Sequence, residues 1–112
     1  MTVFDFGDIV RVPFPFAEQA IVRSRPALII SRGPLGPDGL LVWAAMITNA
    51  FRPDWPGDVA IANSVDLGLV IPSKVRTAKV NALPTGQCAR IGRLDGDTVD
   101  LVRRCLKDAA GW

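Results

Sequence analysis

Apolar residues in this chain come in short runs separated by turn-forming residues. Residues 8–14 read DIVRVPF and alternate between two faces, whereas residues 27–30 (ALII) and 40–47 (LLVWAAMI) are continuous apolar runs. An alternating run is typical of a half-covered strand, and a continuous run of a strand covered on both faces. Glycine and proline dominate residues 33–39, and two prolines and a glycine fall within residues 50–57, so we expect both segments to be loops.

The second half continues in the same way. Residues 58–62 (DVAIA) and 69–71 are short enough for brief strands, residues 74–83 (KVRTAKVNAL) alternate imperfectly, and residues 87–94 (QCARIGRL) close the β part. The pattern predicts six or seven short strands in all.

The hydrophobic period changes after residue 94. Val99, Val102 and Leu106 recur at spacings of three and four, as on one face of a helix. Asp95 or Asp97 can cap its start. We predict a mainly β fold, a partly closed antiparallel barrel with a C-terminal α-helix, built as a single domain over residues 1–112.

Composition limits the chemistry. The chain has no histidine, so general acid–base catalysis at neutral pH has to use other groups. The two cysteines are far apart in the sequence and outside any Cys/His cluster, so we expect no metal site and no cofactor. The N-terminal residues do not resemble a signal peptide, and no apolar run approaches the ~20 residues of a membrane span. We expect a cytoplasmic protein without a membrane partner.

Charge is distributed unevenly along the chain. The formal net charge is only +2, yet residues 74–93 contain no acidic residue and hold five cations, Lys74, Arg76, Lys79, Arg90 and Arg93. A local basic stripe of this kind can follow a phosphate backbone.

Four segments in a fixed order carry a family resemblance: GDIVRVPF, RPALIIS, WAAMITN, and SKVRTAKV followed by IGRL and the helix. Together they resemble the MazF/PemK toxins of type II toxin–antitoxin systems. The resemblance implies an SH3-like barrel, a homodimer, cleavage of single-stranded RNA, and neutralisation by an antitoxin with a disordered acidic C-terminal segment.

Several site residues follow from the resemblance by position. Arg25, just before Pro26, matches the catalytic arginine of the family, and Thr48 matches its catalytic threonine. Arg76 matches a basic position that serves RNA binding or catalysis in some members. The loop before Arg25 departs from the family pattern, although Glu18 could match a loop glutamate of other members.

A metal-independent ribonuclease can use the 2′-hydroxyl beside the scissile phosphate as nucleophile, leaving a 2′,3′-cyclic phosphate and a 5′-hydroxyl. The Arg25 guanidinium suits stabilisation of the phosphorane charge, and Thr48 can donate a hydrogen bond to the phosphate or hold the 2′-hydroxyl. Glu18, a phosphate oxygen or water is the proton acceptor. RNA binding needs cations and stacking faces, for which the candidates are Arg23, Lys74, Arg76, Lys79, Phe16, Phe51 and Trp55.

Other interpretations stay open at this point. Arg25 could instead pair with Asp8 or Asp66, and the chain could be a CcdB-like toxin that poisons DNA gyrase without cutting RNA. It could also be a non-catalytic SH3-like binding module. Cleavage of RNA in EDTA would separate the first function from the other two.

Overall fold

The computed structural model describes residues 3–15 and 22–112; the side chains of residues 14, 15, 22 and 23 also lie outside the description. The described part contains six strands and one α-helix. The strands are β1 (Asp8–Pro15), β2 (Val22–Ile29), β3 (Leu41–Asn49), β4 (Asp58–Ile61), β5 (Ser73–Pro84) and β6 (Ala89–Arg93), and the helix is α1 (Gly96–Ala110).

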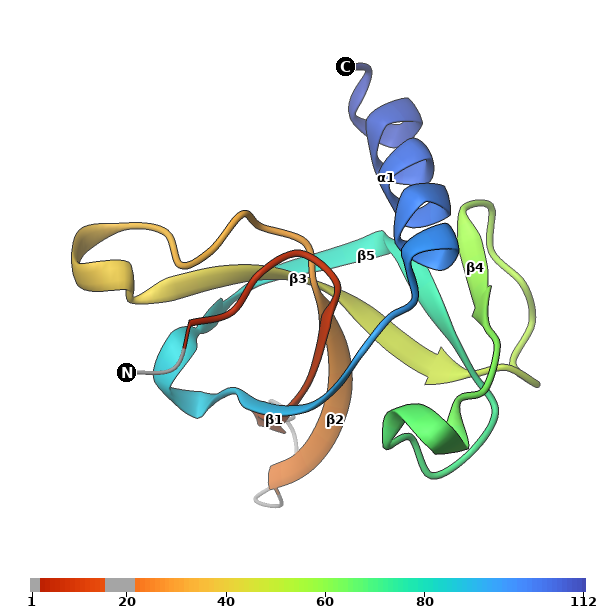
Figure 1. Cartoon of the computed structure of the whole chain (residues 1–112), viewed down its shortest axis with the longest axis horizontal. Coiled ribbons are helices and arrows are strands. Elements are labelled where there is room, and N and C mark those ends of the chain that lie inside the picture. Colours follow the sequence, from red (N-terminus) through yellow and green to blue (C-terminus); the bar gives the residue numbers. More distant parts are fainter. Residues whose placement is uncertain (1–2, 16–21) are drawn as a thin grey trace.

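The six strands form one antiparallel sheet in the order β4-β5-β3-β2-β1-β6. The sheet curls on itself and leaves β4 and β6 as its edges, while α1 stands against β5 and β4 (Figure 1). The prediction of a mainly β, partly closed barrel with a C-terminal helix is therefore confirmed.

Two apolar clusters form because successive residues of each strand point to opposite faces of the sheet. One cluster lies under α1 and includes Ile9, Leu28, Ile47 and the fully buried Val102 of the helix. The other includes Val12, Ala27, Ile29 and Met46 on the opposite face. The continuous apolar runs of β2 and β3 thus serve both faces, as their sequence predicts.

The helix begins where its cap was predicted. The Asp95 carboxylate accepts hydrogen bonds from the backbone N–H of Thr98 at 3.1 Å and from its hydroxyl at 2.7 Å. Gly111 ends the helix in the left-handed region, at φ 75°.

Residues 69–71 do not form the short strand that their apolar character suggests. The backbone turns through a 3₁₀ segment, Val65–Leu67, and the Leu69 N–H donates to the Ser64 carbonyl at 3.0 Å. Leu69 is buried, but Val70 and Ile71 are exposed. Local turn hydrogen bonds form here in place of strand pairing, because only one of the three side chains is buried in the core.

Strand β5 holds an irregularity that the alternation did not reveal. Its register against β3 passes from Val80↔Ala45 to Arg76↔Met46, so three residues of β5, numbers 77–79, have no partner on β3. This bulge reverses which face the strand presents, and residues 73–77 are all buried as a result. The imperfect alternation of residues 74–83 has its physical cause in this bulge.

Candidate functional site

The strand registers place the two predicted catalytic residues on one face of the sheet. Arg25 of β2 lies opposite Val12 of β1, and Thr48 of β3 lies opposite Lys74 of β5. The β2–β3 pairing ends at Ala27↔Met46. Continued by two residues, the same register would set Arg25 opposite Thr48. Directly opposed residues of an antiparallel pair share a face, and both side chains are half-buried.

A second row of residues lies beside the first on the same face. Met46 of β3 pairs with Arg76 of β5, which in turn pairs with Asp58 of β4. Because residues two apart in a strand share a face, Arg76 lies on the side of the sheet that carries Thr48 and Lys74. The sheet thereby brings together one hydroxyl and three cations from positions 25 to 76 of the sequence.

Two of these cations are bound by a buried carboxylate. The Asp58 side chain is 5% exposed, and its oxygens lie 3.0 Å from Arg76 Nη2 and 3.3 Å from Lys74 Nζ. Arg76 Nε also donates to Asp58 at 3.2 Å. Lys74 has a second counter-ion in the exposed Asp54, at 2.7 Å. Lys74 and Arg76 are therefore charge-compensated, and only small parts of either side chain reach solvent.

The carboxyl of Asp58 is held in its charged form. Burial by itself would raise the pKa of Asp58, but hydrogen bonds from the Arg76 side chain, the Trp55 N–H and the Lys74 side chain together outweigh burial. The pKa of Asp58 lies below its ordinary value of 3.8 as a result. Near neutral pH, the Asp58 carboxyl is therefore ionised.

The loop between β3 and β4, residues 50–57, starts directly after Thr48 and Asn49. Its two large aromatic side chains are exposed, Phe51 at 82% and Trp55 at 45%. The Arg76 guanidinium lies over the Trp55 ring, 4.0 Å from the ring centroid. Among the predicted stacking residues in the described part of the chain, Trp55 is connected to the Arg25–Thr48 face through Arg76, and Phe51 lies three residues after Thr48.

The remaining predicted site residues fall in different places. Lys79 is exposed within the β5 bulge. Glu18 and Phe16 lie outside the described residues, as does the side chain of Arg23. The predicted roles of all these residues in RNA binding or catalysis stay predictions.

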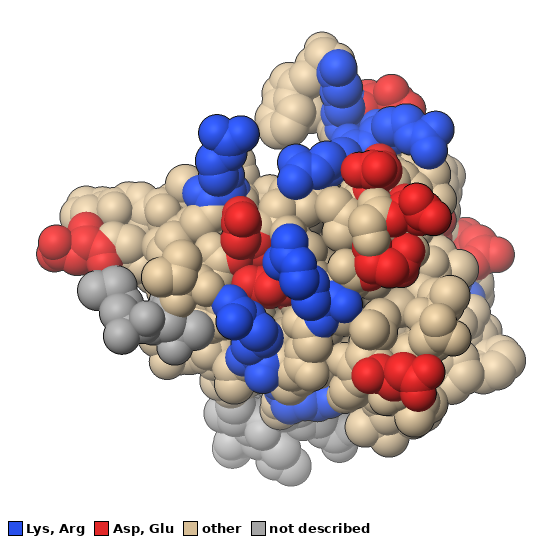
Figure 2. Space-filling view, viewed as in Figure 1, with Lys and Arg blue, Asp and Glu red and all other residues tan. Residues whose placement is uncertain are grey.

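The basic stripe of residues 74–93 does not persist as an uncompensated surface. Besides Lys74 and Arg76, Arg90 and Arg93 are also paired: both donate to the buried Asp8 carboxylate, at 2.9 and 2.8 Å. On the face shown in Figure 2, cations and carboxylates are interleaved. The acidic partners come from β1, from β4 and from the loop between β3 and β4, so the sequence window that lacks acids gave no sign of them.

Asp58 is the functional candidate that the sequence reasoning missed. It begins a short strand after a Trp-Pro-Gly turn, and its sequence neighbours do not include either cation. Only the pairing of β4 with β5 brings Asp58 opposite Arg76. The sequence feature that could have indicated Asp58 was an isolated aspartate at the start of an apolar strand, and this feature is common in proteins.

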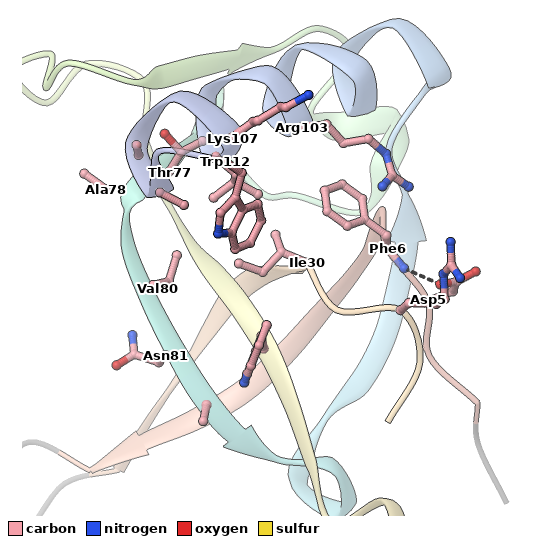
Figure 3. A pocket seen from close by; sticks show the side chains of 16 residues that line it. Asp5, Phe6, Ile30, Thr77, Ala78, Val80, Asn81, Arg103, Lys107 and Trp112 are labelled. Carbon is pink, nitrogen blue, oxygen red and sulfur yellow. Dashed lines mark hydrogen bonds between the residues drawn. The ribbon is translucent and has the colours of Figure 1, made fainter. Parts of the chain in front are cut away.

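A large open pocket of about 1210 Å³ lies elsewhere, between α1 and the sheet. Figure 3 shows Ile30, Val80 and Trp112 around it, with Arg103 close to Phe6 at its rim. Its lining is mainly apolar and includes none of the predicted site residues. Trp43 and Val80, which line it, are each about half exposed, at 50% and 51%.

Among the described residues, no group of three or more His, Cys, Asp or Glu side chains is arranged to hold a metal ion. Within the same part of the chain, no helix is long and apolar enough to cross a membrane.

A curled antiparallel sheet with one terminal helix is also the architecture of several toxin structures. A MazE–MazF structure from Deinococcus radiodurans superposes with a TM-score of 0.77 at 21% identity, covering 99% of this chain and 98% of the other. The Mycobacterium tuberculosis toxin MazF-mt6 gives 0.69 at 21%, with 91% and 95% covered. An endoribonuclease in complex with its cognate antitoxin, from a mycobacterial species, gives 0.71 at 19%, with 96% and 94% covered. The fold is thus that of a small toxin.

The sequence itself defines the family. The model of the PemK-like, MazF-like toxins of type II toxin–antitoxin systems matches residues 5–109, and the chain belongs to this family. Comparison with curated proteins gave no match.

Proposed function

We propose that this chain is a sequence-selective endoribonuclease that cleaves single-stranded RNA without a metal ion. The observation that carries the proposal is the common face of Arg25 and Thr48, the two residues to which the sequence resemblance assigns catalytic roles. A structural neighbour of this chain is itself named an endoribonuclease.

In the proposed reaction, the substrate supplies its own nucleophile. The 2′-hydroxyl oxygen attacks the adjacent phosphorus, the bond from phosphorus to the 5′-oxygen breaks, and the products are a 2′,3′-cyclic phosphate and a 5′-hydroxyl. Arg25 offers planar N–H donors to two phosphate oxygens while negative charge develops on them. Thr48 donates to the phosphate or aligns the 2′-hydroxyl. DNA lacks that hydroxyl and is not cut.

Proton transfer completes the reaction. We assign the proton of the 2′-hydroxyl to Glu18, with a phosphate oxygen or water as the alternative acceptor. Arg25 is not the acceptor, because a guanidinium is a hydrogen-bond donor without a free lone pair to take up a proton. The 5′-oxygen leaves as a hydroxyl after it takes a proton from Arg25 or from water.

We also propose two protein partners, a second copy of this chain and an antitoxin with an acidic C-terminal segment. Neighbouring structures contain MazE with MazF, or an endoribonuclease with its cognate antitoxin. The half-exposed Trp43 and Val80 at the open pocket support a homodimer, because contiguous apolar surface of this kind marks interaction sites. We place the protein in the cytoplasm, acting as one domain.

The decisive experiment is incubation of the purified chain with a long single-stranded transcript in EDTA. We expect fragments with 5′-hydroxyl ends at a short recurring sequence, and no cleavage of single-stranded DNA. Intact RNA would contradict the proposal, and gyrase inhibition in the same preparation would support the gyrase-poison alternative. Cleavage only after metal is added would contradict the metal-free mechanism.

A further inference from the structure

The loop of residues 50–57 is attached to β5 by three side-chain hydrogen bonds. Lys74 Nζ donates to the Arg52 carbonyl at 2.6 Å, and Arg76 Nη2 donates to the Pro53 carbonyl at 2.8 Å. The Thr77 hydroxyl donates to the Gly57 carbonyl at 2.6 Å. A surface loop with exposed aromatic side chains is ordinarily mobile, but this loop is bound by its backbone on both sides of Trp55.

Asp58 connects these hydrogen bonds to the aromatic side chain. Its carboxylate binds Lys74 and Arg76 and also accepts the Trp55 backbone N–H at 2.9 Å. Its own N–H donates to the Trp55 carbonyl at 3.0 Å. Asp58 therefore fixes the backbone of Trp55 directly. It also fixes Arg76, the cation that covers the Trp55 ring.

Arg76 uses its edge and its flat face for different purposes. The N–H groups at its edge are directed to Asp58 and the Pro53 carbonyl, while the flat face of the guanidinium covers one side of the Trp55 indole at 4.0 Å. Since Trp55 is still 45% exposed, its accessible area lies away from Arg76. A flat aromatic surface held in this way can stack with any nucleobase.

We propose that Trp55 is a prebuilt stacking subsite for one unpaired nucleobase of the RNA, and that Asp58 is the positioning residue that holds it beside Thr48 through Arg76 and Lys74. The inference rests on the proposed function and deepens it. Lys74 and Arg76 then serve RNA binding by fixing the loop, and their charge does not neutralise phosphates.

The test measures binding separately from cleavage. The probe is a fluorescein-labelled mixed pool of 2′-O-methyl RNA 12-mers, which cannot form the cyclic phosphate, titrated by anisotropy with the purified full chain. Replacing Trp55 by leucine removes the stacking face, and we expect Kd to rise about 10-fold. Trp55→Phe keeps a ring and recovers most of the affinity. For cleavage of a transcript, KM rises in Trp55→Leu while kcat changes by less than about 2-fold.

Asp58 is tested by its dependence on Trp55. Asp58→Asn alone is expected to raise Kd to the same extent as Trp55→Leu. The double variant is expected to raise Kd no further, because both substitutions remove the same subsite. Asp100→Asn, which makes the same charge change on the exposed face of α1, leaves Kd unchanged. If Asp58→Asn is not folded at 20 °C, Arg76→Lys takes its place, since it keeps the charge but lacks the planar face.

Several outcomes overturn the inference. If Trp55→Leu binds the probe with an unchanged Kd, Trp55 is not a stacking subsite. If the increases in Kd caused by Trp55→Leu and by Asp58→Asn multiply in the double variant, Asp58 acts independently of the ring. A reduced salt dependence of binding in Lys74→Met, which removes a positive charge and keeps Trp55, would show direct phosphate contact by Lys74. If the wild-type chain binds the probe through Trp55 but cuts no RNA, the proposed cleavage fails and the subsite stands.

Discussion

Replacing Asp58 by asparagine is the most informative test of how the molecule is held together. The substitution keeps the shape of the side chain but removes the charge that neutralises two nearly buried cations, with Lys74 4% and Arg76 9% exposed. Breaking a buried ion pair from one side typically costs about 3–5 kcal/mol. Because Lys74 keeps Asp54 as a second counter-ion, we expect the lower end, about 3 kcal/mol.

That loss is large compared with the ~5–15 kcal/mol by which domains are stable. For a chain of this size, we expect the melting temperature at pH 7 to fall by ~12 °C, measured by circular dichroism. The matched control is Asp66→Asn, which removes the same charge from an exposed carboxylate and leaves the melting temperature within about 2 °C. A loss below about 1 kcal/mol would refute the view that this carboxylate compensates the two cations.

The unfolding free energy that Asp58→Asn loses should also depend on pH. The folded-state pKa of Asp58 is lowered from 3.8, so its contribution to stability is complete above that value and is lost as the pH falls through the folded-state pKa. Asparagine does not titrate. The difference in unfolding free energy between wild type and Asp58→Asn should therefore narrow below pH 3.8, and a constant difference down to pH 2 would argue against this sign.

Three further predictions concern separate parts of the chain. Arg25→Ala should lower the rate of RNA cleavage by ~10² or more with unchanged circular dichroism; a folded variant at the wild-type rate refutes the assignment. Gly57→Ala should destabilise by about 2 kcal/mol, because the residue has φ +89° and its added Cβ would lie 2.6 Å from Thr77 Oγ1, whereas Gly86→Ala meets nothing within 4 Å and serves as control. Asp95→Ala should cost ~1 kcal/mol of unfolding free energy by removing the helix cap, and an unchanged urea midpoint would contradict that.

The fold could be predicted from the sequence because its signals are local. The apolar runs at residues 27–30 and 40–47 and the switch of period before α1 depend only on near neighbours, and they located β2, β3 and the helix. The error at residues 69–71 has the opposite origin, since whether an apolar triplet forms a strand depends on an available sheet edge.

The candidate site could be predicted only in part for the same reason. Arg25 and Thr48 were found through motifs, and the strand registers then placed them on a common face. The partners of Lys74 and Arg76 come from a different strand and from a loop, and lie 16 to 23 positions away along the chain. No count of charges along the sequence reveals that such cations are already neutralised.

The pairing of the first strand with the last has a consequence for the timing of activity. Asp8 meets Arg90 and Arg93 across 82 and 85 positions of the chain, and strands that are so distant in sequence associate slowly. A ribosome must therefore release nearly the whole polypeptide before the sheet can be completed. The edge formed by β1 and β6 is therefore assembled only when synthesis of the chain is nearly finished, and any activity that requires the complete sheet starts no earlier.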